Sequence, residues 1–149
     1  MVGLPHGTAH IQLGVPDDDD LAYWEARARG GAALLTVGGS IVHPTTALLN
    51  RWLNEVYNPA AFGQLERRAK LVHAQGAYIT TQLVHLGREN IGGESEYGMV
   101  APSALRSLRT PTIPHPLGLD EVKELVESFV QCSVNLRDTF RTRDRKSVV

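Results

Sequence analysis

The chain has 149 residues and a mass of 16.3 kDa, a length that suits one domain and leaves little room for a second. Hydrophobic residues make up 42% of the chain and charged residues 21%, which excludes a disordered or fibrous protein. The net charge of −1 gives no electrostatic reason to expect nucleic acid or an anionic membrane as a partner. The longest apolar runs are far shorter than a membrane span, no secretory leader is recognisable, and a single cysteine cannot form an internal disulfide. We therefore expect a cytoplasmic protein.

Three short runs along the chain are typical of strands. Residues 2–5 form a short apolar start, residues 32–37 are apolar throughout and stop at Gly38, and residues 77–84 are rich in β-branched and aromatic side chains. Runs without strict polar alternation are typical of strands that are buried on both faces of a parallel sheet.

Three helices are predicted between and after these strands. The first opens at four aspartates, residues 17–20, which we interpret as a cap and a solvated helix start rather than a metal site. The second opens at Asn58, followed by proline, and ends at Gly76. The third begins at about Asp120 and carries an apolar stripe to Leu136.

Strand and helix alternate three times, which predicts an α/β fold of right-handed βαβ units around a parallel sheet. In such sheets the loops at the carboxyl ends of the strands carry the site. These loops are residues 5–16, 38–58 and 85–118, and the last is long enough to be functional.

Three groups at these strand ends could bind a flat ligand. Pro5, His6 and Gly7 form a turn at the first strand, Gly39 belongs to a glycine pair at the second, and Gln82 stands on the third. The Gln82 amide offers one acceptor and two donors in a plane, which matches the edge of an imide or pyrimidine, and glycine leaves room for an aromatic ring. Taken alone, Gln82 could equally be a satisfied strand amide.

The remaining reactive side chains have ordinary structural interpretations. His43 and His115 stand beside prolines and are expected in loops, and His73 is expected to pack on the second helix. Cys132 is expected as a small buried residue. The histidines show no metal-binding spacing, so no metal site is expected.

Five segments, in this order and spacing, resemble the Old Yellow Enzyme family. Within it they look closest to the NADH:flavin oxidoreductase / NADH oxidase branch that includes 2,4-dienoyl-CoA reductase and trimethylamine dehydrogenase. The resemblance covers roughly residues 2–137, and the matching segments are VGLPHGT at 2–8, WEARARGGA at 24–32, VHAQGA at 72–77, QLVHLGR at 82–88 and APSA at 101–104.

The resemblance implies an FMN-binding (β/α)8 barrel that passes hydride from NAD(P)H through FMN to an activated alkene or related small-molecule acceptor. It implies that the flavin is lined by Pro5, His6, Gly7, Gly39 and Gln82. His85 and Arg88 would lie on the third loop, on the substrate side. Gly7 departs from the Cys, Thr or His often found at its position, which puts the redox tuning of the flavin in doubt.

A complete barrel of this kind takes about 250 residues, so we expect the chain to be the first three βα units of one. The proton donor of the family falls outside it, so the catalytic residues are unknown and the isolated chain is expected to be inactive and poorly soluble. From Arg137 onward there are five basic residues and two acidic ones, and residues 138–149 are interpreted as a tail that is not native sequence. The acceptor, the choice between NADH and NADPH and the oligomeric state are not predicted.

Two other readings of the sequence stay open. The first is a non-catalytic α/β module that binds a nucleotide or a protein partner; it predicts a complete small sheet in which the Gln82 side chain is paired internally. The second is a phosphate-binding barrel enzyme without flavin.

Overall fold

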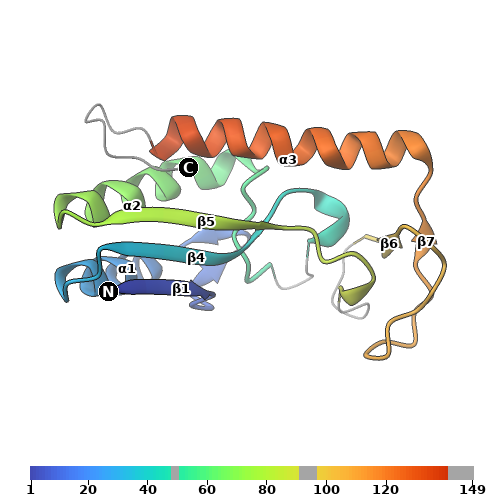
Figure 1. Ribbon diagram of the computed structural model, residues 1–149, viewed down its shortest axis with the longest axis horizontal. Coiled ribbons are helices and arrows are strands. Elements are labelled where there is room, and N and C mark those ends of the chain that lie inside the picture. The colour runs from blue at the N-terminus through green and yellow to red at the C-terminus, as the bar shows by residue number, and fades with distance from the viewer. Residues whose placement is uncertain (48–50, 91–96, 141–149) are drawn as a thin grey trace.

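The computed structural model of the chain describes residues 1–47, 51–90 and 97–140. Its central sheet has three parallel strands in the order β1 (Val2–His6), β4 (Leu34–Ile41) and β5 (Tyr78–Val84). The helices α1 (Asp18–Arg29), α2 (Phe62–Ala74) and α3 (Leu119–Phe140) follow these strands in turn. Figure 1 shows α1 and α2 behind the sheet and α3 along its β5 side. The predicted alternation and the parallel sheet are confirmed.

Smaller elements occupy the loops between strand and helix. After β1, β2 (Ile11–Gln12) pairs antiparallel with β3 (Val15–Pro16). After β4 come two short 3-10 helices, η1 (Pro44–Thr46) and η2 (Pro59–Ala61), and after β5 comes η3 (Gly87–Glu89). The excursion before α3 also contains β6 (Val100–Ala101) paired with β7 (His115–Pro116), so His115 lies in a short strand rather than in an open loop.

The helices begin where the sequence places their caps. The Asp17 side chain accepts a hydrogen bond from the backbone N–H of Asp20 at 2.9 Å and caps α1. The Asn58 side chain does the same for Ala60 at the start of η2, which leads directly into α2. One expectation about this region is wrong: the Asp20 side chain is buried rather than solvated, because it faces Trp24 and α2.

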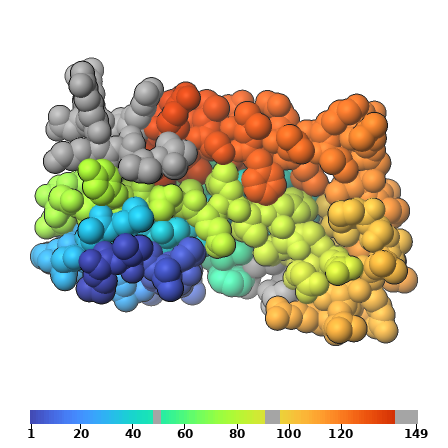
Figure 2. Space-filling view, in the orientation of Figure 1, coloured from blue at the N-terminus to red at the C-terminus, as the bar shows by residue number. Residues whose placement is uncertain are grey.

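The main core lies on the helix side of the sheet, and a smaller cluster around Ile41 and Leu53 lies at the carboxyl end of β4. Side chains from β4 and β5 meet those of the three helices in a single cluster, whose larger members are Trp24, Leu35, Val37, Leu65, Val72, Ile79, Leu136 and Phe140. On the opposite face no helix covers the strands, and Figure 2 shows them at the surface. Val2 is 59% exposed and Leu4 76% exposed on β1. The expectation that the strands are buried on both faces is therefore wrong for this chain, because no helix in the described residues covers the second face, and the small cluster around Ile41 and Leu53 reaches only the carboxyl end of the strands.

Two predicted boundaries also move. The second strand does not stop at Gly38 but continues to Ile41, because the two glycines form a bulge within the strand. The third helix continues past Leu136 to Phe140, which is buried in the core. The first three residues of the predicted foreign tail are thus helical, and residues 141–149 lie outside the described part of the chain. Among the described helices, none combines the length and the apolar character needed to cross a bilayer.

Candidate functional site at the carboxyl ends of the strands

The three predicted ligand-binding groups lie at the same end of the sheet. In the strand register, His6 of β1 is opposite Val37 of β4, and Val37 is opposite Thr81 of β5. Gly7, the Gly38–Gly39 pair and Gln82 each follow directly after this line of residues. Because all three strands run parallel, these groups form one rim at the carboxyl end, where barrel enzymes place their sites.

A bulge of two glycines in β4 lies beside Gln82. The register moves from Val37↔Thr81 to Ser40↔Leu83, so Gly38 and Gly39 together oppose the single residue Gln82. A Cβ on Gly38 would lie 2.7 Å from the His6 nitrogen, which is closer than atoms approach without a clash. Gly39 adopts a φ of +64°, a left-handed conformation that favours glycine. Both glycines are therefore required by the local backbone.

The Gln82 side chain is exposed on the helix-free face of β5. Ile79 and Leu83 pack toward the helices, so alternation along the strand points Gln82 to the other side. The neighbouring Thr81 is held on the helix side, where its hydroxyl accepts a hydrogen bond from Ser40 at 2.5 Å and donates to a backbone carbonyl. Within the described residues, no group is hydrogen-bonded to the Gln82 amide, which leaves its donors and acceptor available.

The structure turns the His6 side chain away from this face. Its Nδ1 donates to the Leu4 carbonyl at 2.8 Å, so its Nε2 accepts from the Tyr23 hydroxyl at 2.5 Å. The ring also stacks on Trp24 of α1, with 4.9 Å between centroids. Both ring nitrogens are thus used inside the fold, and what the Pro5–Gly7 turn offers at the rim is backbone and the exposed Pro5 ring.

His85 and Arg88, predicted on the substrate side, lie in very different surroundings. The His85 Nδ1 accepts from the Gly87 N–H, so its Nε2 donates to the Thr45 hydroxyl at 3.0 Å. The Thr45 hydroxyl donates in turn to the His43 Nδ1 at 2.8 Å. Burial, together with the nearby His43, lowers the pKa of His85 below its ordinary value. His85 therefore ties the loop after β5 to the loop after β4.

Arg88 is exposed, and its Nε lies 3.7 Å from the Glu89 carboxylate. A role for His85 or Arg88 toward a substrate stays a prediction, as do the flavin roles of the other five residues.

One set of residues at the rim was missed. Asp20 of α1 and Arg68 of α2 form an ion pair at 2.9 Å, with side chains 1% and 0% exposed. The sequence did hold a signal: Asp20 is four residues before the buried Trp24, and Arg68 lies three after Leu65 and four before Val72. Both charged side chains are three or four residues from core residues of the same helix. This spacing puts them on the buried face of each helix.

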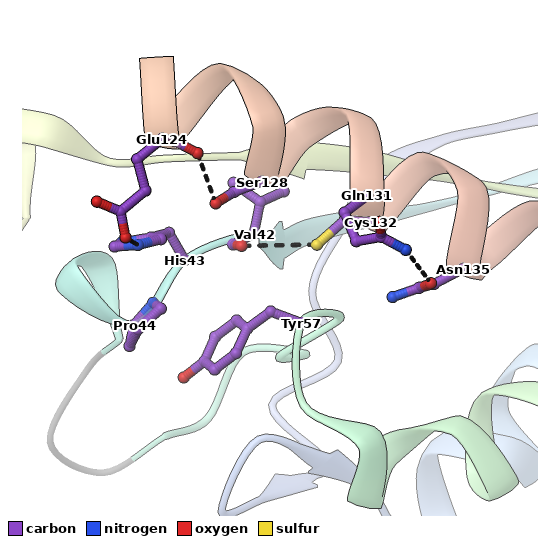
Figure 3. A pocket seen from close by; sticks show the side chains of 9 residues that line it. All are labelled: Val42, His43, Pro44, Tyr57, Glu124, Ser128, Gln131, Cys132 and Asn135. Carbon is purple, nitrogen blue, oxygen red and sulfur yellow. Dashed lines mark hydrogen bonds and ion pairs between the residues drawn. The ribbon is translucent and has the colours of Figure 1, made fainter. Parts of the chain in front are cut away.

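A separate groove lies between α3 and the segment after β4. It has a volume of about 300 Å³ and is lined by Val42, His43, Pro44, Tyr57, Glu124, Ser128, Gln131, Cys132 and Asn135. Figure 3 shows the polar side chains of α3 along one wall and Tyr57 below them. No predicted flavin residue lines it. Cys132 donates to the Val42 carbonyl at 3.5 Å, and burial raises the pKa of its thiol to about 11, as expected of a packing residue.

On the surface near α1, possible ligand atoms of His10, Asp17 and Asp19 lie within 4.8 Å of one another. His10 and Asp19 are exposed, and Asp17 already caps the helix. The expectation that the protein holds no metal stays a prediction.

A parallel sheet with helices on one face, following its strands in turn, is typical of part of an α/β barrel. Residues 1–139 match the NADH:flavin oxidoreductase / NADH oxidase family, and the chain belongs to that family. The predicted family is confirmed. The finer branch with 2,4-dienoyl-CoA reductase and trimethylamine dehydrogenase stays a prediction.

Curated relatives agree with this family. The chain is similar to a metal reductase of Desulforamulus reducens, with 30% identity over 133 residues, covering 89% of this chain and 20% of the relative. It is similar to an NADH oxidase of Thermoanaerobacter brockii, with 33% identity over 121 residues, covering 77% of this chain and 18% of the relative. The chain thus spans about a fifth of the length of these relatives.

Solved structures show the same fold. Morphinone reductase in complex with tetrahydroNAD superposes with a TM-score of 0.82 at 21% identity, over 93% of this chain and 42% of that one. Old Yellow Enzyme from a Pichia species gives a TM-score of 0.80 at 20% identity, over 93% and 39% of the two chains. The predicted partial barrel is confirmed.

Proposed function

We propose that this chain is the N-terminal part of an FMN-dependent oxidoreductase that transfers hydride from NAD(P)H to an activated alkene or a related acceptor. The chain would contribute the first three βα units and one side of the flavin pocket. FMN, when bound, supplies the hydride chemistry by accepting and releasing hydride. The observation that carries the proposal is the unpaired Gln82 amide next to the glycine bulge of β4.

The residues at the rim fit such a cofactor. The Gln82 amide has the planar donors and acceptor that the pyrimidine edge of a flavin requires. Gly38 lies against the His6 backbone and Gly39 against the Leu53 side chain, so the bulge brings the ends of β1 and β4 close together beside Gln82. The backbone of Pro5, His6 and Gly7 stands at the next strand end, with His6 held in place through Tyr23.

The alternative interpretation, a non-catalytic α/β module that binds a nucleotide or a protein partner, explains this rim less well. It expects a complete sheet and an internally paired Gln82, whereas β1 and β5 each have an unpaired edge in the described residues and Gln82 is unpaired. An unpartnered amide on a bare sheet face favours a ligand.

The proposal extends to the rest of the protein and to its location. We propose that further βα units close the barrel, supply the proton donor and bind the cofactor phosphate, and that the protein is cytoplasmic. The proposal also keeps residues 138–149 as a tail of foreign origin. Reading the coding DNA on both sides of this sequence tests both points, and a genomic continuation through codon 149 would refute the foreign tail.

FMN titration tests the cofactor. Because the chain forms only one side of the pocket, we expect weak binding, followed by NMR at millimolar FMN, with chemical-shift changes at Gly38, Gly39 and the Gln82 amide. Gln82→Leu should weaken the affinity about tenfold, since two or three hydrogen bonds are lost. Thr80→Val is the matched control, because Thr80 lies two residues earlier on the same face of β5 and should leave the affinity unchanged. Equal affinity of the parent and Gln82→Leu would contradict the proposal.

A further inference from the structure

A buried polar network joins the two loops that flank the proposed flavin rim. The Thr8 hydroxyl, directly after the Pro5–Gly7 turn, donates to Asp20 Oδ1 at 2.6 Å. Arg68 donates from one nitrogen to Asp20 Oδ2 at 2.9 Å and to Asn54 Oδ1 at 3.1 Å. Asn54 lies in the loop after β4, and its backbone carbonyl accepts from the N–H of Ile41 at the end of that strand. The network therefore connects the first loop, both helices and the second loop.

Holding two helices together through a buried ion pair has a high cost in free energy. Removing two charges from water carries a large desolvation penalty, and apolar residues of similar size often stabilise a fold better. The Arg68 Nε and Nη2 atoms are also buried without a hydrogen-bond partner in the described residues. Burial lowers the pKa of Arg68, and Asp20 opposes that shift. The pair is therefore weak evidence for a gain in stability.

The loop that it holds is strained. Ala9, next to Thr8, adopts a φ of +61°, and Leu13 in the same loop adopts +51°. Such left-handed conformations cost free energy in residues other than glycine and persist only where surrounding contacts enforce them. The bond from Thr8 to Asp20 is a contact of that kind, since it ties the start of this loop to a buried carboxylate in the N-terminal turn of α1.

We propose that Asp20, held by Arg68, is a positioning residue that fixes the loop after β1 at the rim where the flavin ring would lie. The residue acts through Thr8 on the backbone of Pro5, His6 and Gly7 and touches no ligand itself. The inference rests on the proposed function for the identity of the ligand. The hydrogen bond from Thr8 to Asp20, which ties the loop to α1, does not depend on the proposed function.

The same two helices provide a matched control. Arg67 and Asp18 form a second ion pair at 3.1 Å, but their side chains are 58% and 80% exposed. This pair links α2 to α1 without touching the loop after β1. Its removal breaks a contact between the same two helices and leaves the hydrogen bond between Thr8 and Asp20 intact.

The experiment compares four variants of the full chain with the parent. Thr8→Val removes the hydroxyl and keeps the ion pair, and the double variant Asp20→Leu with Arg68→Met removes both charges and keeps an apolar core. The Asp17 amide donates to the His10 carbonyl of this loop at 3.2 Å. In both variants its hydrogen–deuterium exchange should rise about tenfold, because a hydrogen bond to a charged group is lost and the loop is held less firmly. Thr8→Ser, which restores the hydroxyl, should exchange like the parent. Asp18→Asn, the control, should also do so.

FMN titration of the same proteins gives the second readout. We expect Thr8→Val to bind FMN about tenfold more weakly, with Thr8→Ser and Asp18→Asn at the parent value. Parent-like exchange in Thr8→Val overturns the proposal, and so does faster exchange with unchanged FMN affinity. If neither the parent nor any longer polypeptide containing it binds FMN, the proposed function fails, and the exchange data alone decide whether Asp20 positions the loop.

Discussion

Gly38 in β4 and Gly63 in α2 allow a prediction in which the same substitution, glycine to alanine, has opposite effects on stability. At Gly38, an added Cβ would lie 2.7 Å from the His6 nitrogen and 2.9 Å from its Cα and carbonyl carbon. At Gly63, in the first turn of α2, an added Cβ would meet nothing within 4 Å. Both changes are Gly→Ala, so the only difference between them is the surrounding structure.

The size of each effect follows from these contacts. Ordinary contact begins near 3.4 Å, so β1 would have to retreat by roughly 0.5–1 Å along backbone atoms that cannot rotate away. Overpacking of this kind costs about 1–3 kcal/mol, a large share of the ~5–15 kcal/mol of a typical domain. Gly63→Ala should instead stabilise by about 0.5 kcal/mol, because alanine restricts the unfolded chain and favours the helix.

Urea unfolding measures both effects. Trp24 is fully buried in the core and reports the transition by fluorescence, with far-UV circular dichroism as the second probe. Gly38→Ala should move the midpoint to lower urea and Gly63→Ala should leave it equal or higher. If Gly38→Ala unfolds at the parent midpoint, the close approach of β1 to the β4 bulge is wrong, and with it the rim.

Three further predictions concern other parts of the molecule. Because burial raises the pKa of Cys132 to about 11, iodoacetamide at pH 8 should modify it only after unfolding; equal rates with and without urea would contradict its burial. The lowered pKa of His85 means that stability is present above its ordinary pKa of 6.5 and is lost as pH falls below it. His85→Asn keeps an acceptor for the Gly87 N–H and cannot titrate, so its urea midpoint should fall less than that of the parent between pH 7.5 and 5.5. Leu4 on β1 and Val126 on α3 are exposed apolar residues, and such residues promote aggregation. Val126→Lys should raise the soluble concentration of the protein without changing its circular dichroism spectrum. If this variant aggregates as much as the parent, the prediction is wrong.

Local signals in the sequence determined the main elements of this fold. Asn58 with its following proline, Asp17 before α1, and the glycines after α1 and α2 act on their own backbone, so they mark the ends of helices wherever the chain folds. The order of the family segments predicted both the partial barrel and the strand ends that form the rim. These features depend on neighbours in the chain, which a sequence displays.

Tertiary structure alone decided how the side chains at the rim are used. His6 turns toward Tyr23, Asp20 is buried by Arg68, 48 residues away, and the Gly38–Gly39 pair becomes a bulge rather than a strand end. Each outcome depends on a partner distant in the chain, and short-range periodicity carries no information about such partners. The bare second face of the sheet has the same origin, since a strand is buried on both sides only if other parts of a protein cover it.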